Sequence, residues 1–323
     1  MGQNLRPKGT KPALYNPLGL WQNRNHDIVS AIILIFLNGT KPAPFSRKKD
    51  MVALLVFLCY NCMGDTMKEK QEIAESRYNT VTKANELIQK SKYALSVQQQ
   101  KIVLYLISQI NPHAEEFKIL KFKIKDFCKI CGINYNSGFY YTEIKKQIKK
   151  ISDKSCYMKL PNGKETLLRW IKTPYFDEEN GTIEIELDNN MKPFLLQLRE
   201  NFTQYELSYT LLFKSKYSIR LFELLESYHF HKLEVLEKEI DIEELKYILD
   251  CENYKQFKDF RTRVIEPSIK EIKENTIYSL EYEPIKESRK IVALKFILTP
   301  KEIIEQLQTQ ADNETKFERG LKP

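Results

Sequence analysis

The chain has 323 residues, of which 42% are hydrophobic, and its formal net charge is +8. This length and hydrophobic content exclude a disordered chain and suffice for two ordinary cores. The positive charge suits a polyanionic partner, but the first 66 residues hold eight Lys and Arg against three Asp and Glu, so the remainder is nearly balanced.

Residues 1–78 differ from the rest of the chain, and we expect an N-terminal extension without fixed structure. Its apolar runs, residues 28–37 and 51–60, are each about half of the roughly 20 residues that a membrane-spanning helix needs. Arg47-Lys48-Lys49 before the second run resembles a secretory signal, but no small-residue cleavage site follows. We therefore expect a cytoplasmic protein without membrane contact, and Met67 as the physiological start.

The six cysteines are expected to be reduced thiols. Cys59/Cys62 and Cys128/Cys131 have a spacing at which each pair could supply half of a zinc site. Both pairs lie among apolar residues, where packing as small buried side chains explains them better. We expect no metal and no cofactor.

From residue 79 a series of elements follows that is typical of a winged helix. A helix over Val97–Ile110, capped by Ser96, precedes a strand over Phe117–Ile124 and a short helix, Lys125–Ile130, that stops at Gly132. The next elements are a helix over Tyr141–Ser152, strands over Tyr157–Leu160 and Leu167–Lys172 around the turn Pro161–Lys164, and a hairpin at Glu179–Thr182.

The same order returns in the second half of the chain. The predicted elements are a helix over Lys214–Tyr228, a strand over Lys232–Ile240, a helix over Ile242–Leu249 capped by Asp241, a long helix over Tyr254–Lys273, strands over Ile277–Tyr282 and Ile291–Leu298, and a charged loop, Pro284–Lys290, between them. We therefore predict an α+β chain with two tandem winged-helix (helix-turn-helix) domains, residues 79–204 and 205–300, each with its own core, and a tail, 301–323.

In a helix-turn-helix the second helix enters the major groove of DNA, so its outer face must offer groups for phosphates or bases. In the first unit the inner stripe is Ile144, Ile148 and Ile151, and the outer side chains are Thr142, Lys145, Lys146, Lys149 and Lys150. This face is almost purely basic, so we expect it to hold phosphates.

The second unit presents a more varied outer face. Its predicted inner stripe is Phe257, Phe260, Val264, Ser268 and Ile272, and its candidate DNA contacts are Lys255, Lys258, Thr262, Arg263 and Lys270. Arginine can pair bidentately with guanine, so we expect this helix to discriminate bases. We also expect Pro267 to bend the helix near Arg263. The wings add Lys164 in the first unit and Arg289 and Lys290, beside Lys286, in the second.

The segments Ser215–Leu225, Phe257–Ile272, Asn85–Ser91 and Leu95–Lys101 resemble the iteron-binding plasmid replication initiators, a family with two winged helices. The resemblance extends over residues 79–298. It implies that monomers bind directly repeated origin sites, that dimers bind an inverted-repeat operator and repress the initiator's own gene, and that the origin is opened for a host initiator and helicase. It also implies Lys258, Arg261 and Arg263 as the main base-reading residues, and a first domain that both contacts DNA and forms the dimer. The helical projection, however, places Arg261 nearer the inner face.

Two alternatives remain open from the sequence. His229-Phe230-His231 matches the metal-binding string of rolling-circle initiators and relaxases, with Tyr247 or Tyr254 as the nucleophile, if the string lies in a strand. A dimeric transcription repressor would share every DNA-binding feature. No Gly-rich phosphate loop of an ATP-driven helicase is present in the sequence, and we expect a protein without catalytic activity.

Overall fold

The structure is a computed structural model that describes residues 71–131, 133, 139–160 and 162–306. Several predictions fall outside these residues: the apolar runs 28–37 and 51–60, the signal-like Arg47-Lys48-Lys49, the Cys59/Cys62 pair, the start at Met67, the helix stop at Gly132 and most of the tail. Within the described part of the chain, no helix is long and apolar enough to cross a membrane.

Residues 71–77 form a helix that is tied to the first unit. At its end, Arg77 donates hydrogen bonds from Nε to the backbone oxygen of Ile130 (3.0 Å) and from Nη2 to that of Lys129 (2.6 Å). These carbonyls lie in the last turn of the helix Ile124–Ile130, where backbone oxygens can accept hydrogen bonds from side chains. The prediction of an extension without fixed structure is therefore wrong for residues 71–77.

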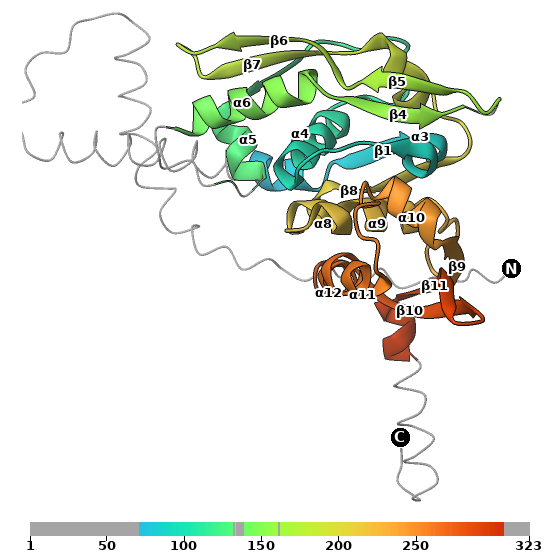
Figure 1. Ribbon diagram of the computed structural model, residues 1–323. Coiled ribbons are helices and arrows are strands. Elements are labelled where there is room, and N and C mark those ends of the chain that lie inside the picture. Colours follow the sequence, from blue (N-terminus) through green and yellow to red (C-terminus); the bar gives the residue numbers. More distant parts are fainter. Residues whose placement is uncertain (1–70, 132, 134–138, 161, 307–323) are drawn as a thin grey trace, which may run out of the picture. The chain divides into compact units, whose positions relative to one another are not determined.

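The first unit combines short helices with small antiparallel sheets. Its elements are β1 (Thr80–Ala84), α3 (Asn85–Lys90), β2 (Ser91–Lys92), α4 (Val97–Ser108), β3 (Leu120–Lys123), α5 (Ile124–Ile130), α6 (Tyr140–Ser152), β4 (Ser155–Lys159), β5 (Glu165–Arg169), β6 (Ile171–Asp177), β7 (Thr182–Leu187), η1 (Asn189–Met191) and α7 (Lys192–Leu195). Two three-stranded sheets have the orders β2-β4-β5 and β3-β7-β6. In Figure 1, β4 to β7 lie along the top, over α4 and α6.

The predicted start of α4 is confirmed by its capping geometry. Ser96 Oγ accepts a hydrogen bond from the backbone N of Gln99 (3.3 Å), and Gln99 Oε1 accepts one from the backbone N of Ser96 (3.1 Å). This reciprocal capping box satisfies amides that the first helical turn leaves without partners. The helix therefore begins at the residue that the sequence predicts.

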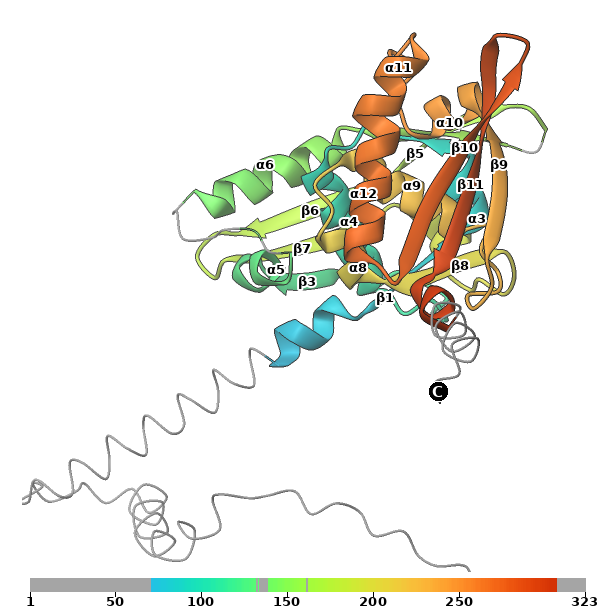
Figure 2. The same cartoon turned by 90° about the horizontal axis from the view of Figure 1, so that it is seen from below.

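Three elements link the two units: β8 (Phe202–Glu206), α8 (Leu207–Leu211) and α9 (Lys216–Glu226). β8 pairs antiparallel with β1, from Thr80 opposite Glu206 to Ala84 opposite Phe202. α9 contacts α3 and α4 of the first unit and α12 (Glu266–Asn275) of the second, as Figure 2 also shows. The predicted domain junction at residues 204 and 205 stays a prediction.

The second unit is a compact winged helix. Its elements are β9 (Leu236–Asp241), α10 (Ile242–Ile248), α11 (Phe257–Phe260), the π-helical segment η2 (Arg261–Ile265), α12, β10 (Tyr278–Glu287) and β11 (Lys290–Pro300). Its strands form one sheet of order β10-β11-β9. The cap predicted at Asp241 is confirmed, because its Oδ1 accepts from the backbone N of Glu243 (2.8 Å) and Glu244 (3.0 Å).

The predicted charged loop between the last two strands is mostly strand. β10 continues to Glu287, which pairs with Lys290, so that only Ser288 and Arg289 form the turn. A bulge between Ile285 and Lys286 shifts the register and lets the strand bend there. Most side chains along this part of β10 are exposed, and a solvent-facing hairpin accepts charged residues that a buried strand would exclude. The strand predicted from Lys232 begins at Leu236.

The two units share one continuous hydrophobic core, which corrects the prediction of two separate cores. The reason is α9, whose buried residues include Ile219, Leu221 and Phe222. A helix that is buried on nearly all sides must be covered by more than one layer. The second unit is therefore packed onto the first through this helix.

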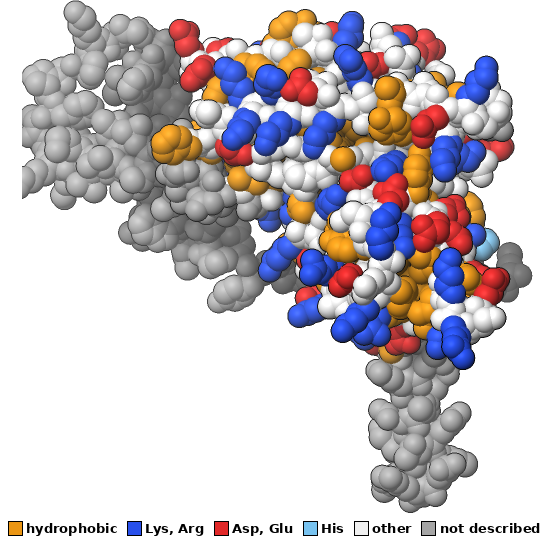
Figure 3. All heavy atoms as spheres, in the orientation of Figure 1, with side chains coloured by type: hydrophobic (Ala, Val, Ile, Leu, Met, Phe, Trp, Pro, Cys, Tyr) orange, Lys and Arg blue, Asp and Glu red, His pale blue; other side chains and the backbone are white. Residues whose placement is uncertain are grey.

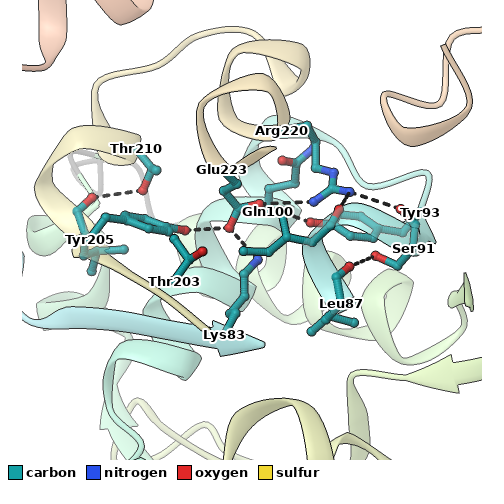
Figure 4. Close-up of polar contacts among 12 residues, drawn as sticks. Lys83, Leu87, Ser91, Tyr93, Gln100, Thr203, Tyr205, Thr210, Arg220 and Glu223 are labelled. Atoms are coloured by element: carbon teal, nitrogen blue, oxygen red, sulfur yellow. Dashed lines mark hydrogen bonds and ion pairs between the residues drawn. The ribbon is translucent and has the colours of Figure 1, made fainter. Parts of the chain in front are cut away.

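A buried ionic cluster fixes α9 to the first unit (Figure 4). Glu223 forms ion pairs with Lys83 of β1 and with Arg220 (3.3 Å), and the hydroxyl of Tyr205 donates to its Oε1 (2.6 Å). Arg220 Nη2 also donates to the backbone oxygens of Ile88 (3.0 Å) and Ser91 (3.1 Å). Burial by itself would raise the pKa of Glu223, but the two cations outweigh it and hold the pKa below its ordinary value.

Candidate nucleic-acid interface

The outer face of α6 is basic and exposed, as predicted. Ile144, Ile148 and Ile151 on its inner face are at most 1% exposed, whereas the predicted outer residues Thr142, Lys145, Lys146, Lys149 and Lys150 are all exposed. The amphipathic spacing of the sequence explains this separation. The projection missed Gln147, which is buried and whose Oε1 accepts a hydrogen bond from Gln99 of α4 (2.8 Å).

The lysines on α6 differ in the contacts that they make within the protein. Lys149 forms an ion pair with Asp153 (2.7 Å), and Lys145 Nζ lies 5.4 Å from the centre of the Phe176 ring. Lys146 and Lys150 have no ion pair with any residue that the structure describes. These two cations are therefore the most available on α6 for an external anion.

In the second unit, α11, η2 and α12 follow one another without a break as a single long helix. The predicted inner stripe is confirmed, because Phe260, Val264, Ser268 and Ile272 are buried and Phe257 is half-buried. Every candidate on the outer side is exposed: Lys255 before the helix, and Lys258, Arg261, Thr262, Arg263 and Lys270 on it. This face mixes cations, Thr262 and the carboxylates of Asp259 and Glu266.

Arg261 corrects the helical projection. A regular α-helix placed it towards the inner face, but its side chain is 45% exposed and its Nε pairs with Glu266 (3.3 Å). Arg261 is the first residue of η2, where the helix departs from regular α-geometry because a π-helical turn holds more residues than an α-turn. Pro267 lies two residues after the end of this segment; it lacks an N–H, and its ring would meet the carbonyl of Arg263 in a regular helix. The bend predicted near Arg263 stays a prediction.

The two wings carry their predicted cations at exposed tips. In the first wing, β4 and β5 pair from Ser155 opposite Arg169 to Lys159 opposite Glu165. Gly163 has a φ of 78°, which glycine adopts without strain, and Asn162 Oδ1 accepts from the backbone N of Lys164 (3.0 Å). In the second wing, Arg289 and Lys290 are exposed beside Ser288. The hairpins therefore present Lys164, Arg289 and Lys290 to solvent.

The two candidate helices are exposed on the same side of the molecule. Figure 3 shows Lys and Arg side chains gathered over α6 and again over the region of α11 and α12. In Figure 2, α11 and the turn between β10 and β11 project in the same direction. An elongated polyanion lying across this side could contact both units. Duplex DNA has that shape and charge.

The His229-Phe230-His231 string does not lie in a strand, which the nicking alternative requires. Residues 229–231 lie outside any helix or strand, between α9 and β9. His229 is buried; its Nε2 donates to the backbone oxygen of Glu234 (2.8 Å), and its ring packs edge-on against Tyr278. His231 is exposed. Among the described residues, no group of three or more His, Cys, Asp or Glu is arranged to hold a metal ion.

The remaining candidate groups for chemistry also have structural roles. Cys128 and Cys131 are buried, as predicted, and burial raises the pKa of the Cys128 thiol to about 11. Tyr247, one of the two proposed nucleophiles, donates its hydroxyl to Glu165 Oε1 (2.8 Å), and the ring of the other, Tyr254, packs edge-on against Tyr217. These placements give the nicking alternative no geometric support.

Sequence reasoning missed the groups that connect the two units. Lys92, Asp250 and Glu252 form ion pairs between β2 and the segment after α10, and no local pattern indicates such long-range pairs. The buried cluster did leave a signal, because Arg220 and Glu223 are charged residues within the apolar sequence of α9. Charges at such positions are rarely buried unless they are paired.

Comparisons with known proteins identify the family of the chain. The family model described as "Initiator Replication protein, WH1" matches residues 80–226, and the one described as "Initiator Rep protein, WH2" matches residues 241–298. Together these matches cover more than half of the chain.

One solved structure supports this fold. The Pi initiator protein, solved in complex with iteron DNA, superposes with a TM-score of 0.59 at 20% identity, over 69% of this chain and 98% of that one. The WH1 domain of MSBI1.176, a replication protein isolated from a multiple sclerosis patient, matches with a TM-score of 0.23 at 21% identity, over 30% and 74% of the two chains. Domains 2 and 3 of RctB match with a TM-score of 0.34 at 14% identity, over 67% and 79%. The chain belongs to the family of initiator replication proteins that carry a WH1 and a WH2 winged-helix domain.

Proposed function

We propose that this protein is a plasmid replication initiator that binds directly repeated sites in duplex origin DNA through both winged helices. The observation that carries the proposal is the pair of exposed polar helix faces, on α6 and on α11 to α12, on one side of a chain of the initiator family. The structural neighbour Pi was solved with iteron DNA, which supports repeated sites as the ligand.

In this proposal the two helices have different tasks. Lys146 and Lys150 on α6, with Lys145, Lys149 and Thr142 beside them, contact phosphates, because lysine acts as a point charge. Arg263, Lys258 and Thr262 contact base edges in the major groove, with Lys255, Arg261 and Lys270 near them. The wing residues Lys164, Arg289 and Lys290 contact the flanking backbone.

The proposal extends to the steps that follow binding. Bound monomers help to open an AT-rich origin and bring in a host initiator and helicase, and dimers formed through the first domain bind an inverted repeat and repress the initiator's own gene. The protein has no catalytic activity of its own and acts in the cytoplasm, where the plasmid DNA is. Family membership supports these steps.

A binding assay and a replication assay test the proposal together. We expect tight binding to origin repeats, with affinity at least about 10³-fold above that for a scrambled duplex at the same salt concentration. Equal affinity for both duplexes would contradict sequence-specific binding. Replication of a plasmid that carries only the origin, with this protein supplied in trans, separates an initiator from a repressor, because a repressor supports no replication.

The nicking alternative has its own test. Supercoiled origin DNA incubated with the protein and Mg²⁺ or Mn²⁺ should stay uncut. A covalent adduct between a tyrosine and DNA would overturn the assignment of a protein without catalytic activity.

A further inference from the structure

A set of polar contacts joins the sheet β2-β4-β5 of the first unit to the end of α10 in the second. Lys92 Nζ pairs with Glu252 (2.5 Å) and lies 3.9 Å from an oxygen of Asp250. Tyr247 donates its hydroxyl to Glu165 (2.8 Å), and Lys159 Nζ lies 3.9 Å from the centre of the Tyr247 ring. Each of these contacts connects the first unit to the second.

The position of these contacts along the chain gives them a mechanical consequence. Asp250 and Glu252 lie between α10 and α11, which is the turn of the second helix-turn-helix. Lys92 pairs in register with Tyr157 of β4, and β4 begins only a few residues after α6 ends. The contacts therefore connect the region after the C-terminal end of α6 to the region before the N-terminal end of α11. These are the two candidate DNA-contacting helices.

The backbone at Asp250 is a second, independent observation. Its φ is 53°, in the left-handed region. The backbone N of Cys251 donates to Lys246 O (2.9 Å) and that of Asp250 to Tyr247 O (3.1 Å), which is the Schellman arrangement that usually places glycine here. Aspartate tolerates this conformation better than most residues. Unlike glycine, it also supplies a carboxylate, which pairs with Lys216 (3.0 Å) as well as Lys92.

The charges at this junction are partly shielded from water. Side chains of Lys92, Asp250 and Lys216 are 23–29% exposed, and that of Glu252 is 38% exposed. Partial burial alone would raise the pKa of Glu252, but the hydrogen bond and charge of Lys92, a backbone hydrogen bond and the charge of Lys255 together outweigh it and hold the pKa below its ordinary value. Ion pairs of this kind are modest individually, and several in one network act together.

We propose that Lys92, Glu165, Tyr247, Asp250 and Glu252 form an interdomain clasp that sets the separation and rotation between α6 and α11, so that both helices fit one DNA site of fixed spacing. These are positioning residues, which act through the two helices. The inference rests on the proposed function, since it concerns how the two units share one duplex.

The test compares DNA sites of different spacing. One duplex carries the native site; the other has two base pairs inserted between the segments that the two units protect, which rotates one segment by about 70° relative to the other. The variants are Lys92→Met, Asp250→Asn and Tyr247→Phe. Lys92→Arg is the conservative variant that keeps the charge, and Lys90→Met is the matched control, because Lys90 pairs with Glu86 inside one helix.

In the wild type the insertion should lower affinity strongly. Lys92→Met should weaken binding to the native site about three- to tenfold and reduce the insertion penalty by at least about threefold, because loosened units adapt to the new spacing. Lys92→Arg and Lys90→Met should keep the wild-type penalty. An unchanged penalty in Lys92→Met, Asp250→Asn and Tyr247→Phe alike would overturn the clasp.

A measurement without DNA separates failure of the clasp from failure of the proposed function. Lys92→Met changes the first unit, yet amide hydrogen exchange should speed up in residues 250–256 of the second, and Lys90→Met should leave it unchanged. If exchange there does not change in Lys92→Met, the clasp is refuted even where DNA binding is normal. If the wild type does not prefer origin repeats, the proposed function fails and the exchange result alone decides the clasp.

Discussion

The helices α6 and α11 to α12 have the same inner face and very different outer faces. Both bury an apolar stripe at helical spacing, with Ile144 and Ile148 in one and Phe260 and Val264 in the other. The outer face of α6 is dominated by lysine, whereas that of α11 to α12 mixes arginine, lysine, threonine and carboxylates. The apolar inner stripe determines which side of each helix packs against the core. The side chains of the outer face determine what each helix can recognise.

This difference supports the proposed division of labour on DNA. A lysine surface follows phosphates, which every sequence offers, so it contributes affinity without specificity. Carboxylates on the other helix repel phosphates, and a surface that retains them is better suited to the base edges in the groove. Substitutions in the fold and on each outer face test this comparison.

The largest effect is expected at Glu223 on α9, the helix that contacts both units. Glu223→Ala leaves Lys83 and Arg220 buried without their counter-charge, and should lower the free energy of unfolding by about 3–5 kcal/mol. Denaturant titration measures this loss. The matched change Glu86→Ala removes a surface pair with Lys90 and should cost less than about 0.5 kcal/mol. Equal costs would contradict a structural role for the cluster.

The lowered pKa of Glu223 predicts that the stability of the protein falls at acidic pH. Because its neighbours hold the pKa of Glu223 below the ordinary 4.5, its contribution to stability is present above that value and is lost as the pH falls through the folded-state pKa. Wild-type stability should therefore decline below about pH 4.5 more steeply than that of Glu223→Gln. Parallel pH profiles of the two proteins would refute this.

The next effect concerns base recognition by α11 to α12. Arg263→Ala should weaken binding to the specific site by about 1–3 kcal/mol and affect random DNA much less. Arg263→Lys keeps the charge but loses the bidentate fork, so most of the specific loss should remain. Competition binding with specific and random duplexes measures both. A loss of equal size on the two duplexes would remove Arg263 from base recognition.

A smaller and more uniform effect is expected on α6. Lys146→Ala should reduce affinity for specific and random DNA alike and lower the slope of log affinity against log salt by about 1, because one phosphate contact is lost. Titrations at several salt concentrations give this slope. If Lys146→Ala lowered affinity for the specific site much more than affinity for random DNA, the assignment of α6 to the DNA phosphates would be contradicted.

The smallest effect is expected at Lys149 of the same helix. Its ammonium already pairs with Asp153 (2.7 Å), so a phosphate must compete with that carboxylate. Lys149→Ala should change the salt slope less than Lys146→Ala, and Asp153→Asn should increase binding slightly. If Lys149→Ala changed the salt slope more than Lys146→Ala, the ion pair that Lys149 forms without DNA would not predict how strongly it contacts a phosphate.

The features predicted correctly from the sequence are those that depend on near neighbours. The caps at Ser96 and Asp241, the inner faces of both helices and the turn at Gly163 each follow from a few consecutive residues. The exposure of Arg261 was missed because the projection assumed a regular α-helix, whereas a π-helical segment begins at this residue.

Features formed by distant parts of the chain could not be predicted in this way. The shared core depends on α9 packing between the two units, and Lys92 meets Glu252 only after both units have folded. No local pattern carries such information. The candidate DNA contacts could be predicted because the helical periodicity that places the apolar residues on the inner face also places the remaining residues on the outer face.

The most direct test of the division of labour is a hydroxyl-radical footprint on an origin repeat. The wild type should protect two neighbouring segments of the duplex, one for each unit. Changing Lys146 and Lys150 together to alanine should remove protection from one segment, and Arg263→Ala should weaken the other. A footprint with a single segment, or one in which both sets of changes weaken the same segment, would contradict the account.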